Sequence, residues 1–348
     1  MNKSLVIPVF IPHSGCPHQC AFCNQSIITS QSSGVPDQQA IHLVIDQYLS
    51  YQGNRQRVEI AFFGGNFLGL PSDVIERLLE GAKGYLRNGK IHGIRFSTRP
   101  DTITRRKLDL IRPYPITVVE LGVQSMNNRV LSRVKRGHTE KDTRHAVRLL
   151  KKYRYSVGVQ VMTGLPGDTP VSLMESTRRV AALEPEVARI YPLLVLKGSL
   201  LEQWYRAGEY TPPDLDESIS LCKEMIHIFH AHQVRVIRVG LQAGESMADK
   251  SAVLAGPWHP AFGHLVFSRM MRDKTMGEID AVLSEYQKDT DSSIPQSVSL
   301  VVHSRSESRL RGDRNENIRH LETRYPRIDF RILKDDTVPV DGIKVRAG

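Results

Sequence analysis

The sequence predicts an α/β fold, a partial TIM-like (β/α)6 barrel followed by a small C-terminal α+β domain. Apolar, β-rich runs recur along the first 241 residues, and the segments between them repeat apolar residues every three or four positions, as in 74–86. Such alternation predicts parallel strands joined by crossover helices. At 348 residues, the chain has room for a barrel of about 200 to 250 residues and a smaller domain.

Seven apolar runs predict the parallel strands, at 5–11, 58–63, 91–97, 117–123, 157–162, 187–194 and 234–241. The character of the sequence changes after about residue 260. There we predict a strand at 297–303, a basic turn at 305–314, a helix near 315–324 and a strand at 328–333. The predicted domains are therefore 1–260 and 261–348.

Glycine-rich or polar residues follow the predicted strands. A cysteine-rich run follows the first strand, and later strands end near Gly64, Gly65, Asn66, Ser97, Gln124 and the segment 160–168. In a (β/α) barrel, the loops at the carboxyl ends of the strands carry the chemistry. The sequence therefore predicts that these residues meet at one mouth.

Three of the four cysteines, Cys16, Cys20 and Cys23, lie in a C-x3-C-x2-C spacing. Three thiolates are one too few to close a tetrahedral metal site. A four-iron cluster held by three cysteines keeps one iron open, and this spacing suggests S-adenosylmethionine (SAM) as its ligand. The alternative is a zinc ion with His13 or His18 as the fourth ligand, although zinc sites usually use two separated ligand pairs and no second pair is present.

Composition narrows the class of protein. Hydrophobic residues make up 40% and charged residues 24%, as in globular proteins, and no apolar run approaches the roughly 20 residues of a membrane helix. The apolar start is broken by Pro8 and shows no small-residue cleavage site, so we expect a cytoplasmic protein. The formal net charge of +10 favours a polyanionic partner such as RNA.

Six stretches resemble the radical SAM enzymes, in the branch near the Elongator catalytic subunit and the oxygen-independent coproporphyrinogen oxidases. They are 13–25, 62–67, 97–101, 120–125, 136–139 and 158–168. The resemblance implies a radical SAM barrel with a [4Fe-4S] cluster on the three cysteines. One electron from the cluster would cleave SAM to methionine and a 5′-deoxyadenosyl radical, which would abstract a hydrogen atom from the substrate. A donor protein such as flavodoxin or ferredoxin would supply the electron to the cluster.

The resemblance further implies that seven residues contact SAM, namely Phe22, Gly65, Asn66, Ser97, Gln124, Arg136 and Gln160. Gly65 and Asn66 would bind the amino group, since adjacent glycines let the backbone approach a ligand closely. Arg136 would bind the methionine carboxylate, because a planar guanidinium can donate two parallel hydrogen bonds to a carboxylate. A solvated basic face is the alternative for Arg136, which has basic neighbours.

The remaining contacts concern the ribose and the adenine. Ser97 and Gln124 would face the ribose hydroxyls, and Gln160 the ribose or a neighbouring water. Ser97 and Gln160 stand where the coproporphyrinogen oxidases carry carboxylates, so the resemblance does not fix the exact ribose contacts in this chain. Phe22 would pack on the adenine, and burial in its own loop is the alternative.

Tyr191 and Lys197 are the catalytic candidates. Both would lie near the end of the sixth strand, where a phenol can deliver a hydrogen atom and a lysine can hold an anion. Simple packing for Tyr191 and solvation for Lys197 are the alternatives. The stretch 189–198 resembles the Elongator branch. That enzyme carries an acetyltransferase domain and a further zinc-binding cysteine, and this chain has the length and the cysteines for neither, so we expect no acetyl transfer.

The preferred substrate is RNA, tRNA in particular. Arginines that crowd around Gly312 would help to bind RNA phosphates, and these are Arg305, Arg309, Arg311, Arg314 and Arg319. One alternative is radical SAM chemistry on a small anionic metabolite, such as a porphyrin-like carboxylate. Another is a non-catalytic RNA-binding protein that carries zinc.

Overall fold

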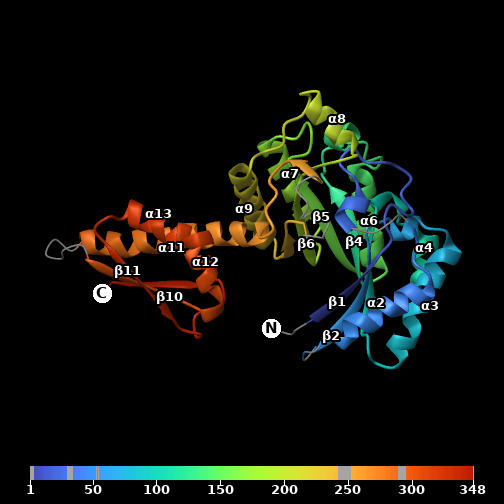
Figure 1. Ribbon diagram of the computed structural model, residues 1–348, viewed down its shortest axis with the longest axis horizontal. Helices are drawn as coiled ribbons and strands as arrows, with labels where there is room; N and C mark the ends of the chain where they lie inside the picture. The colour runs from blue at the N-terminus through green and yellow to red at the C-terminus, as the bar shows by residue number, and fades with distance from the viewer. Residues whose placement is uncertain are drawn as a thin grey trace. The chain divides into compact units, whose positions relative to one another are not determined.

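The structure is a computed structural model that describes residues 4–29, 34–51, 53, 55–241, 252–288 and 295–347. The chain divides into two compact units, Met1–Pro260 and Ala261–Gly348 (Figure 1). No helix in these described ranges is long and apolar enough to cross a membrane.

Seven parallel strands form one curled sheet in the first unit, in the order β1-β2-β3-β4-β5-β6-β8. Their bounds are β1 (Ser4–Phe10), β2 (Arg57–Phe63), β3 (Gly93–Thr98), β4 (Ile116–Gln124), β5 (Ser156–Thr163), β6 (Val187–Pro192) and β8 (Arg235–Val239). Within the described residues, the sheet ends at β1 and β8, so it is a half-barrel with an open side. The predicted α/β fold with a partial barrel is confirmed.

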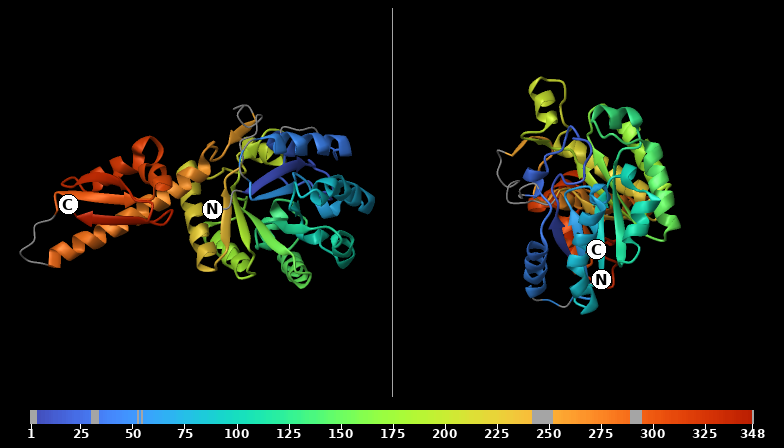
Figure 2. Two further views of the ribbon diagram at one scale, coloured as in Figure 1. Left: turned by 90° about the horizontal axis from the view of Figure 1, so that it is seen from below. Right: turned by 90° about the vertical axis from the view of Figure 1, so that its right-hand side faces the viewer.

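Helices cover the outer face of this sheet (Figure 2). The longer ones are α2 (Gln38–Ser50), α3 (Ser72–Arg87), α4 (Arg105–Ile111), α6 (Glu140–Lys152), α7 (Pro170–Ala181) and α9 (Leu215–Ala231). Most begin at a side chain that caps free amides: the Asp37 carboxylate accepts from the Ala40 amide of α2 at 2.8 Å, and Asp214 caps α9 in the same way. The apolar repeat of α3 buries Ile75 against the sheet side, as its spacing predicted.

Strand alternation divides the residues between the two faces of the half-barrel. Phe62 and Phe96 point outward and stack on Phe67, with ring centroids 5.0 and 4.5 Å apart, which makes an aromatic core under the helices. Their neighbours Glu59 and Arg95 occupy the opposite, inward face. The inside of the half-barrel is therefore polar.

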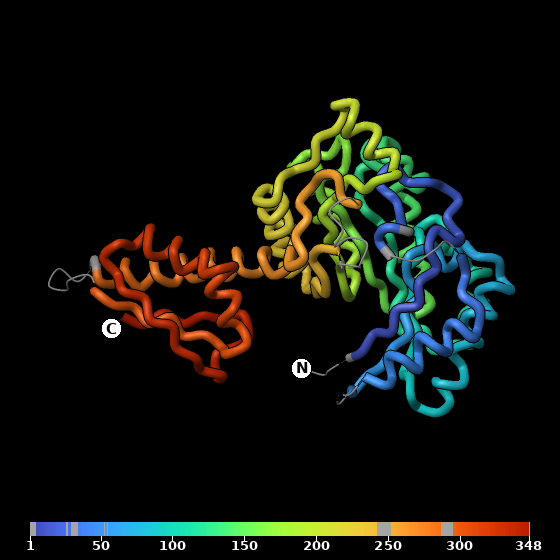
Figure 3. The backbone as a smooth tube through the Cα atoms, in the orientation of Figure 1, coloured from blue at the N-terminus to red at the C-terminus, as the bar shows by residue number. Residues whose placement is uncertain are grey.

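Shorter elements complete the first unit. They are α1 (Gln25–Thr29), η1 (Phe67–Gly69), η2 (Pro100–Thr102), α5 (Asn128–Arg133), β7 (Val195–Leu196), α8 (Leu200–Arg206) and β9 (Val253–Ala255). β7 and β9 pair antiparallel. In Figure 3 the backbone passes from β1 into the cysteine-rich loop, which precedes α1.

The second unit has a three-stranded sheet in the order β11-β10-β12. Its elements are α11 (Phe262–Lys288), β10 (Ser297–Val302), η3 (Ser304–Ser306), α12 (Glu307–Arg311), η4 (Asp313–Asn315), α13 (Glu316–Arg324), β11 (Asp329–Lys334) and β12 (Ile343–Ala347). The helices α11, α12 and α13 pack with the sheet around Leu300, Leu310 and Leu321. The stretch 305–314, which the sequence predicted as a basic turn, contains α12 instead.

Two of the arginines around Gly312 form ion pairs within the second unit. Arg309 forms an ion pair with Asp341, and Arg311 forms one with Glu307 at 2.9 Å. The sequence of this unit has 15 basic and 14 acidic residues, so it carries only +1 of the formal net charge of +10. The basic character of the chain lies in the first unit.

Candidate functional site

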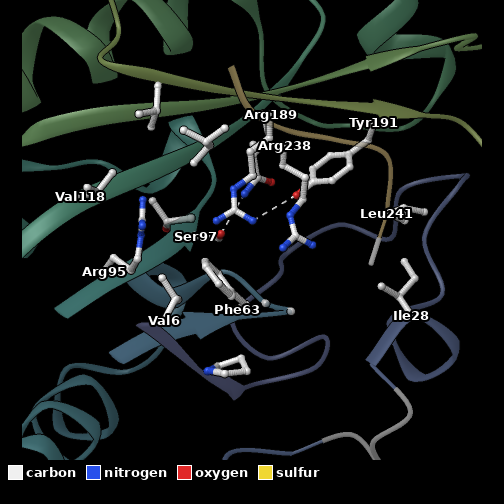
Figure 4. Close-up of a pocket in the computed structure, with 18 of the residues that line it drawn as sticks. Val6, Ile28, Phe63, Arg95, Ser97, Val118, Arg189, Tyr191, Arg238 and Leu241 are labelled. Carbon is white, nitrogen blue, oxygen red and sulfur yellow. Dashed lines mark hydrogen bonds between the residues drawn. The ribbon is translucent and has the colours of Figure 1, made fainter. Parts of the chain in front are cut away.

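A cavity of about 1740 Å³ fills the inner side of the half-barrel and extends to the carboxyl ends of its strands (Figure 4). Nine of the predicted site residues line it: Cys16, Phe22, Cys23, Gly65, Ser97, Gln124, Arg136, Gln160 and Tyr191. They come from different strands and loops between residues 16 and 191, so the fold brings together groups that are distant in the sequence.

The cysteine loop is anchored on both sides. The Ala21 amide donates to the Val134 carbonyl at 3.0 Å, and the Leu201 amide donates to the Ala21 carbonyl at 2.8 Å. Cys20 is buried, whereas Cys16 and Cys23 are partly exposed and line the cavity. The loop therefore presents its thiols from a fixed backbone at the end of β1.

The turn after β2 and the cysteine loop approach each other so closely that each needs a glycine at the contact. A Cβ on Gly65 would lie 2.3 Å from the Ile11 carbonyl oxygen, and one on Gly15 would lie 2.3 Å from the Asn66 carbonyl oxygen. Gly15 also has a φ of +74°, which favours glycine. The cysteine loop and the turn after β2 thus pack backbone against backbone, and Gly64 and Gly65 face the cavity.

Asn66 is used differently from the expectation that its side chain would bind SAM. The side chain is fully buried, and its Nδ2 donates to the Gly15 carbonyl at 2.7 Å. Its Oδ1 accepts from the Thr98 hydroxyl at 2.7 Å and from the Arg99 amide at 3.0 Å. Asn66 joins the cysteine loop to the end of β3 and is not among the residues that line the cavity.

We expect Asn66→Ala to lower the free energy of unfolding of the first unit by about 3 kcal/mol, because buried groups left unpaired cost about 1 to 3 kcal/mol each. Urea unfolding followed by circular dichroism measures this change. The matched control is Asn88→Ala, at an exposed position after α3, which should stay within about 0.5 kcal/mol of wild type. A similarly small effect of Asn66→Ala would contradict the structural role.

Arg99 connects two of the motifs behind the cysteine loop. It is buried, and its Nε and Nη2 donate to the two carboxylate oxygens of Asp101, each at 2.9 Å. Nη2 also donates to the Arg136 carbonyl at 2.6 Å. The segment 97–101 therefore fixes the backbone of the segment 136–139, and sequence reasoning gave Arg99 no role.

Arg136 points toward the cysteines. Its Nη1 donates to the Cys20 Sγ at 3.2 Å, and its Nη2 donates to the Gly122 carbonyl at 2.6 Å. The side chain is 8% exposed, which is incompatible with a solvated basic face. Its Nε has no hydrogen-bond partner among the described residues. The guanidinium thus lies between a thiol and the cavity and keeps donor capacity for a ligand.

The surroundings of Cys16 and Cys23 raise the pKa of both thiols. The pKa of Cys23 is raised to about 12, mainly by burial and also by the neighbouring Cys20 and Cys16, against the opposing charge of Arg136. Burial also raises the pKa of Cys16, again against Arg136. Thiolates in this loop would therefore need cationic partners, which coordination to iron provides.

His138 is a buried histidine next to this region. Its pKa is lowered to about 3, mainly by burial and also by the charges of Arg136 and Arg99. Neither ring nitrogen has a hydrogen-bond partner among the described residues. The ring is therefore neutral at physiological pH and adds no charge beside the two arginines.

Gln124 ends β4 in an unusual backbone conformation. Its φ is +67°, and the pairing between β4 and β5 shifts register between Gly122 and Gln124. The side chain is buried at the cavity wall, and its Oε1 has no hydrogen-bond partner among the described residues. A buried unpaired acceptor at a cavity wall fits a hydroxyl donor on a ligand.

Ser97 and Gln160 meet across β3 and β5. The Gln160 Nε2 donates to the Ser97 hydroxyl at 3.0 Å and to a Glu120 carboxylate oxygen at 3.2 Å. Both side chains line the cavity. Glu120 fixes the orientation of the Gln160 amide, so Gln160 presents its carbonyl oxygen away from this pair.

A buried layer of ion pairs crosses the inner face of the sheet. Arg95 lies between Glu59 at 3.4 Å and Glu120 at 3.1 Å, and Glu120 also pairs with Arg189 at 2.7 Å. Sequence reasoning missed this layer. The signal was present as charged residues at alternate positions within apolar strands, which indicates side chains that face a polar interior.

The structure separates the two catalytic candidates. Tyr191 lines the cavity, and its hydroxyl accepts from the Arg189 Nη1 at 3.5 Å. Lys197 follows β7 with an exposed side chain and is not among the residues that line the cavity. Its backbone carbonyl accepts from the Asn24 Nδ2 at 2.7 Å. β6 ends at Pro192, and the chain then leaves the sheet and forms the short strand β7 before Lys197. The sequence analysis did not predict β7.

A preformed site for a single metal ion is absent from the described residues, in which no three His, Cys, Asp or Glu side chains gather around one point. Zinc needs all of its sulfur ligands at about 2.3 Å. A four-iron cluster instead binds each cysteine at a different iron, so its ligands lie farther apart. The His13 Nε2 accepts from the Gln25 amide at 2.9 Å, so this nitrogen already has a partner.

Comparison with protein families gives the decisive match: residues 10–180 match the model of the radical SAM superfamily, and residues 185–272 match the radical SAM C-terminal domain. The chain belongs to the radical SAM superfamily. An uncharacterized protein of Methanocaldococcus jannaschii is 30% identical over 240 residues, which cover 65% of this chain and 73% of that protein.

Further relatives connect this radical SAM protein to the Elongator branch. The tRNA uridine(34) acetyltransferase of Dehalococcoides mccartyi is 29% identical over 230 residues, which cover 57% of this chain and 50% of that enzyme. The solved structure of the archaeal Elp3 of Methanocaldococcus infernus, with residues 1–46 deleted, has a TM-score of 0.62 at 22% identity. It covers 79% of this chain, and this chain covers 64% of it. This likeness establishes the shared fold.

The cavity residues fit the cofactors that the radical SAM superfamily implies, a [4Fe-4S] cluster and SAM. Three thiols lie on one anchored loop, which matches a cluster with one open iron. The Arg136 Nε and the Gln124 Oε1 are a donor and an acceptor without partners among the described residues. SAM carries a carboxylate and ribose hydroxyls that complement these two atoms.

Proposed function

We propose that this radical SAM protein binds a [4Fe-4S] cluster through Cys16, Cys20 and Cys23, holds SAM in the half-barrel cavity, and abstracts a hydrogen atom from RNA, specifically tRNA. The observation that carries the proposal is the position of the Arg136 guanidinium, which contacts Cys20 and is buried at the cavity wall. When bound, the cluster supplies the electron that cleaves SAM to a 5′-deoxyadenosyl radical.

The side chains of the cavity would hold SAM in one orientation. Arg136 would donate to the methionine carboxylate, and the backbone of Gly65 would accept from the amino group, because no side chain blocks its approach. The unpaired Gln124 Oε1 would accept from a ribose hydroxyl, with Gln160 and Ser97 beside it. These contacts fix the reacting bond relative to the cysteine loop, which is the main requirement for a controlled radical reaction.

Phe22 would form the adenine contact. It is partly buried and packs against the apolar cluster that contains Ala21, Val130 and Leu165. It also lines the cavity, so Phe22 contacts both the apolar cluster and the ligand space. Such an aromatic surface suits stacking by a nucleobase.

Tyr191 is the remaining candidate near the substrate. Tyr191 lies at the carboxyl end of β6 and lines the cavity. Its hydroxyl accepts a hydrogen bond from Arg189, two residues earlier in the same strand. We propose that Tyr191 orients the substrate or delivers a hydrogen atom to it. Lys197 is not retained in this proposal, because its side chain lies outside the cavity lining.

Charge supports RNA as the substrate. The first unit carries +9 of the formal net charge of +10, and seven arginines but only two glutamates line its cavity. Basic surfaces of this kind attract the phosphates of nucleic acids. A relative that is 29% identical over 230 aligned residues is named a tRNA uridine(34) acetyltransferase, and this chain spans half of its length. A tRNA enzyme would work in the cytoplasm, with a reductant such as flavodoxin or ferredoxin as partner.

RNA binding can be measured directly. We expect the reconstituted protein to bind an unmodified tRNA transcript, and we expect Kd to rise at least tenfold between about 50 and 200 mM salt, because phosphate contacts release counterions. Fluorescence anisotropy at several salt concentrations gives both quantities. If no tRNA is bound at the lowest salt while a porphyrin-like polycarboxylate binds, the substrate is a small anion and the tRNA proposal is wrong.

A further inference from the structure

The cysteine loop has a solvent-exposed part that does not belong to the cavity. Pro17, His18 and Gln19 lie between the first two cysteines, are exposed, and are not among the residues that line the cavity. Cys16 and Cys23, in the same loop, do line it. The loop therefore borders the cavity with its thiols and meets solvent with the residues between them.

α5 and the turn that follows it pack against this exposed part of the loop. The Val134 carbonyl accepts from the Ala21 amide at 3.0 Å. Gly137 lies so close to the His18 ring that a Cβ at this glycine would collide with it. The segment 128–137 is thus the neighbour of the cysteine loop outside the cavity.

Two basic side chains stand at this contact. Arg133 and Lys135 flank Val134, are exposed, and are not among the residues that line the cavity. We call these two residues, together with His18 and Gln19, the outer loop surface.

The outer loop surface has no acidic residue of its own. The segments 1–36 and 121–139, which contain it, have no aspartate and no glutamate in their sequences. Within the part of the chain that the structure describes, neither Arg133 nor Lys135 forms an ion pair with an acid. Both charges are therefore available to a partner.

The acids that adjoin these segments have other partners. Asp101 pairs with Arg99 at 2.9 Å, and Glu140 pairs with Arg144 at 2.9 Å and also with Arg179. The Asp142 carboxylate accepts from the Thr139 amide at 2.7 Å. These carboxylates hold the backbone and the neighbouring helices, so the outer loop surface stays positive.

Asp168 is the acid closest in sequence to a contact of Arg133. A Cβ on Gly167 would lie 3.0 Å from the Arg133 Cδ, and Asp168 comes next in the chain. Its Oδ1 accepts from the Thr169 amide at 3.1 Å and from the Ser172 hydroxyl. Burial raises the pKa of Asp168, which is opposite to the effect of a paired arginine.

The outer loop surface is adjacent to the buried cysteine. Gln19 precedes Cys20 in the chain, and Arg136, which follows Lys135, donates from its Nη1 to the Cys20 Sγ at 3.2 Å. Electron transfer between proteins slows steeply with distance, so a protein donor has to dock where the cluster is close to the surface. A donor at this place would approach the cysteines without entering the cavity that SAM and the substrate would fill.

We propose that the outer loop surface is the docking site of an acidic electron-transfer protein, a flavodoxin or a ferredoxin, that reduces the cluster. The donor is oxidised by one electron and the cluster is reduced by the same electron. The proposal rests on the proposed function and specifies where its reductant binds. Arg133 and Lys135 would steer the acidic partner, and encounters between redox proteins need only small interfaces. RNA suits this surface less well, because the substrate has to reach the cavity.

The test is a charge reversal, Arg133→Glu with Lys135→Glu in one protein. We expect its Kd for an acidic flavodoxin, measured by isothermal titration calorimetry at low salt, to rise at least about tenfold. We expect a similar fall in the rate of 5′-deoxyadenosine formation with reduced flavodoxin, whereas the rate with dithionite, a small reductant that needs no docking site, should match wild type. A variant with exchanged basic residues, Arg133→Lys with Lys135→Arg, should bind flavodoxin as wild type does.

The matched control is Arg148→Glu with Lys152→Glu, which changes the net charge by the same amount. Both residues are exposed on the later turns of α6, in the same unit. This control should bind flavodoxin within about threefold of wild type, because steering depends on charge near the interface. An equal loss in both double variants would overturn the docking site, because the effect would then be general electrostatic attraction. Equilibrium dialysis with SAM verifies that each variant is folded, and Arg133→Gln alone replaces a double variant that is not.

Two further results separate this inference from the proposed function. If wild type forms no 5′-deoxyadenosine even with dithionite, the proposed function fails, and the docking site is then judged by the binding data alone. Wild-type affinity for flavodoxin in the Arg133→Glu, Lys135→Glu protein would overturn the docking site and leave the proposed function intact. So would a wild type that binds neither flavodoxin nor ferredoxin, or a variant that loses tRNA binding while it keeps flavodoxin binding, since the surface would then serve the RNA.

Discussion

Cys20→Ala is expected to remain without iron after anaerobic reconstitution and to form no 5′-deoxyadenosine. A four-iron cluster with one open iron needs all three cysteines, and two thiolates on this loop cannot hold it. Cys20 is the buried member of the three, and Arg136 contacts its sulfur. Iron and sulfide analysis together with the visible absorption spectrum measures the effect.

Cys222→Ala is the matched control for this experiment. Cys222 is the fourth cysteine of the chain and is fully buried in α9, away from the cysteine loop in sequence. Its replacement should reduce stability by about 1 kcal/mol and leave the iron content unchanged. A Cys20→Ala protein with a full complement of iron would contradict the assignment of the cluster ligands, as would iron loss in Cys222→Ala.

Arg136→Ala is expected to retain the cluster and to bind SAM at least about tenfold more weakly. A hydrogen bond to a charged group contributes about 1.5 to 3 kcal/mol, which corresponds to about a 10- to 100-fold change in affinity. The visible spectrum reports the cluster, and equilibrium dialysis with labelled SAM reports the affinity. Arg136→Lys should recover part of the loss, because it keeps the charge without the planar fork.

Arg129→Ala provides the control for this variant, since Arg129 is exposed on α5 and belongs to the same basic stretch. It should bind SAM as tightly as wild type does. Unchanged SAM affinity in Arg136→Ala would remove Arg136 from the cofactor site. Loss of the cluster together with the affinity would instead show that the contact with Cys20 is its main role.

The sequence predicted the half-barrel well because its signals are local. Each strand is an apolar run of β-rich residues, and each helix repeats its apolar residues with helical spacing, so the positions of β2 and α3 follow from short windows. The cysteine spacing is equally local. The predicted meeting of these elements at one mouth follows from the general rule for parallel strands and agrees with the residues that line the cavity.

Side-chain direction was not predictable from these windows. Asn66 follows the glycines in the sequence, but its carboxamide satisfies the Gly15 carbonyl and the Thr98 hydroxyl rather than the cavity. The sequence predicted a strand that runs to residue 194, with Lys197 close to its end. In the structure, β6 ends at Pro192, and the separate strand β7 precedes Lys197. Both outcomes depend on contacts between segments that are distant in sequence.

The second unit was predicted least completely. β12 is a short strand with alternating basic residues, which is also typical of a polar terminal segment, and it is stabilised by pairing with β10 and by packing against α11. α11 has apolar residues around much of its circumference, so no clear helical stripe marks it. Among the arginines near Gly312, Arg309 pairs with Asp341, which lies far away in the sequence and could not be matched to it from a short window.

The formation of 5′-deoxyadenosine by the anaerobically reconstituted protein, incubated with SAM and dithionite, tests the central claim most directly. The account predicts a brown protein that contains iron and sulfide and that converts SAM to 5′-deoxyadenosine and methionine. A colourless protein that retains one zinc ion per chain and leaves SAM intact would contradict it.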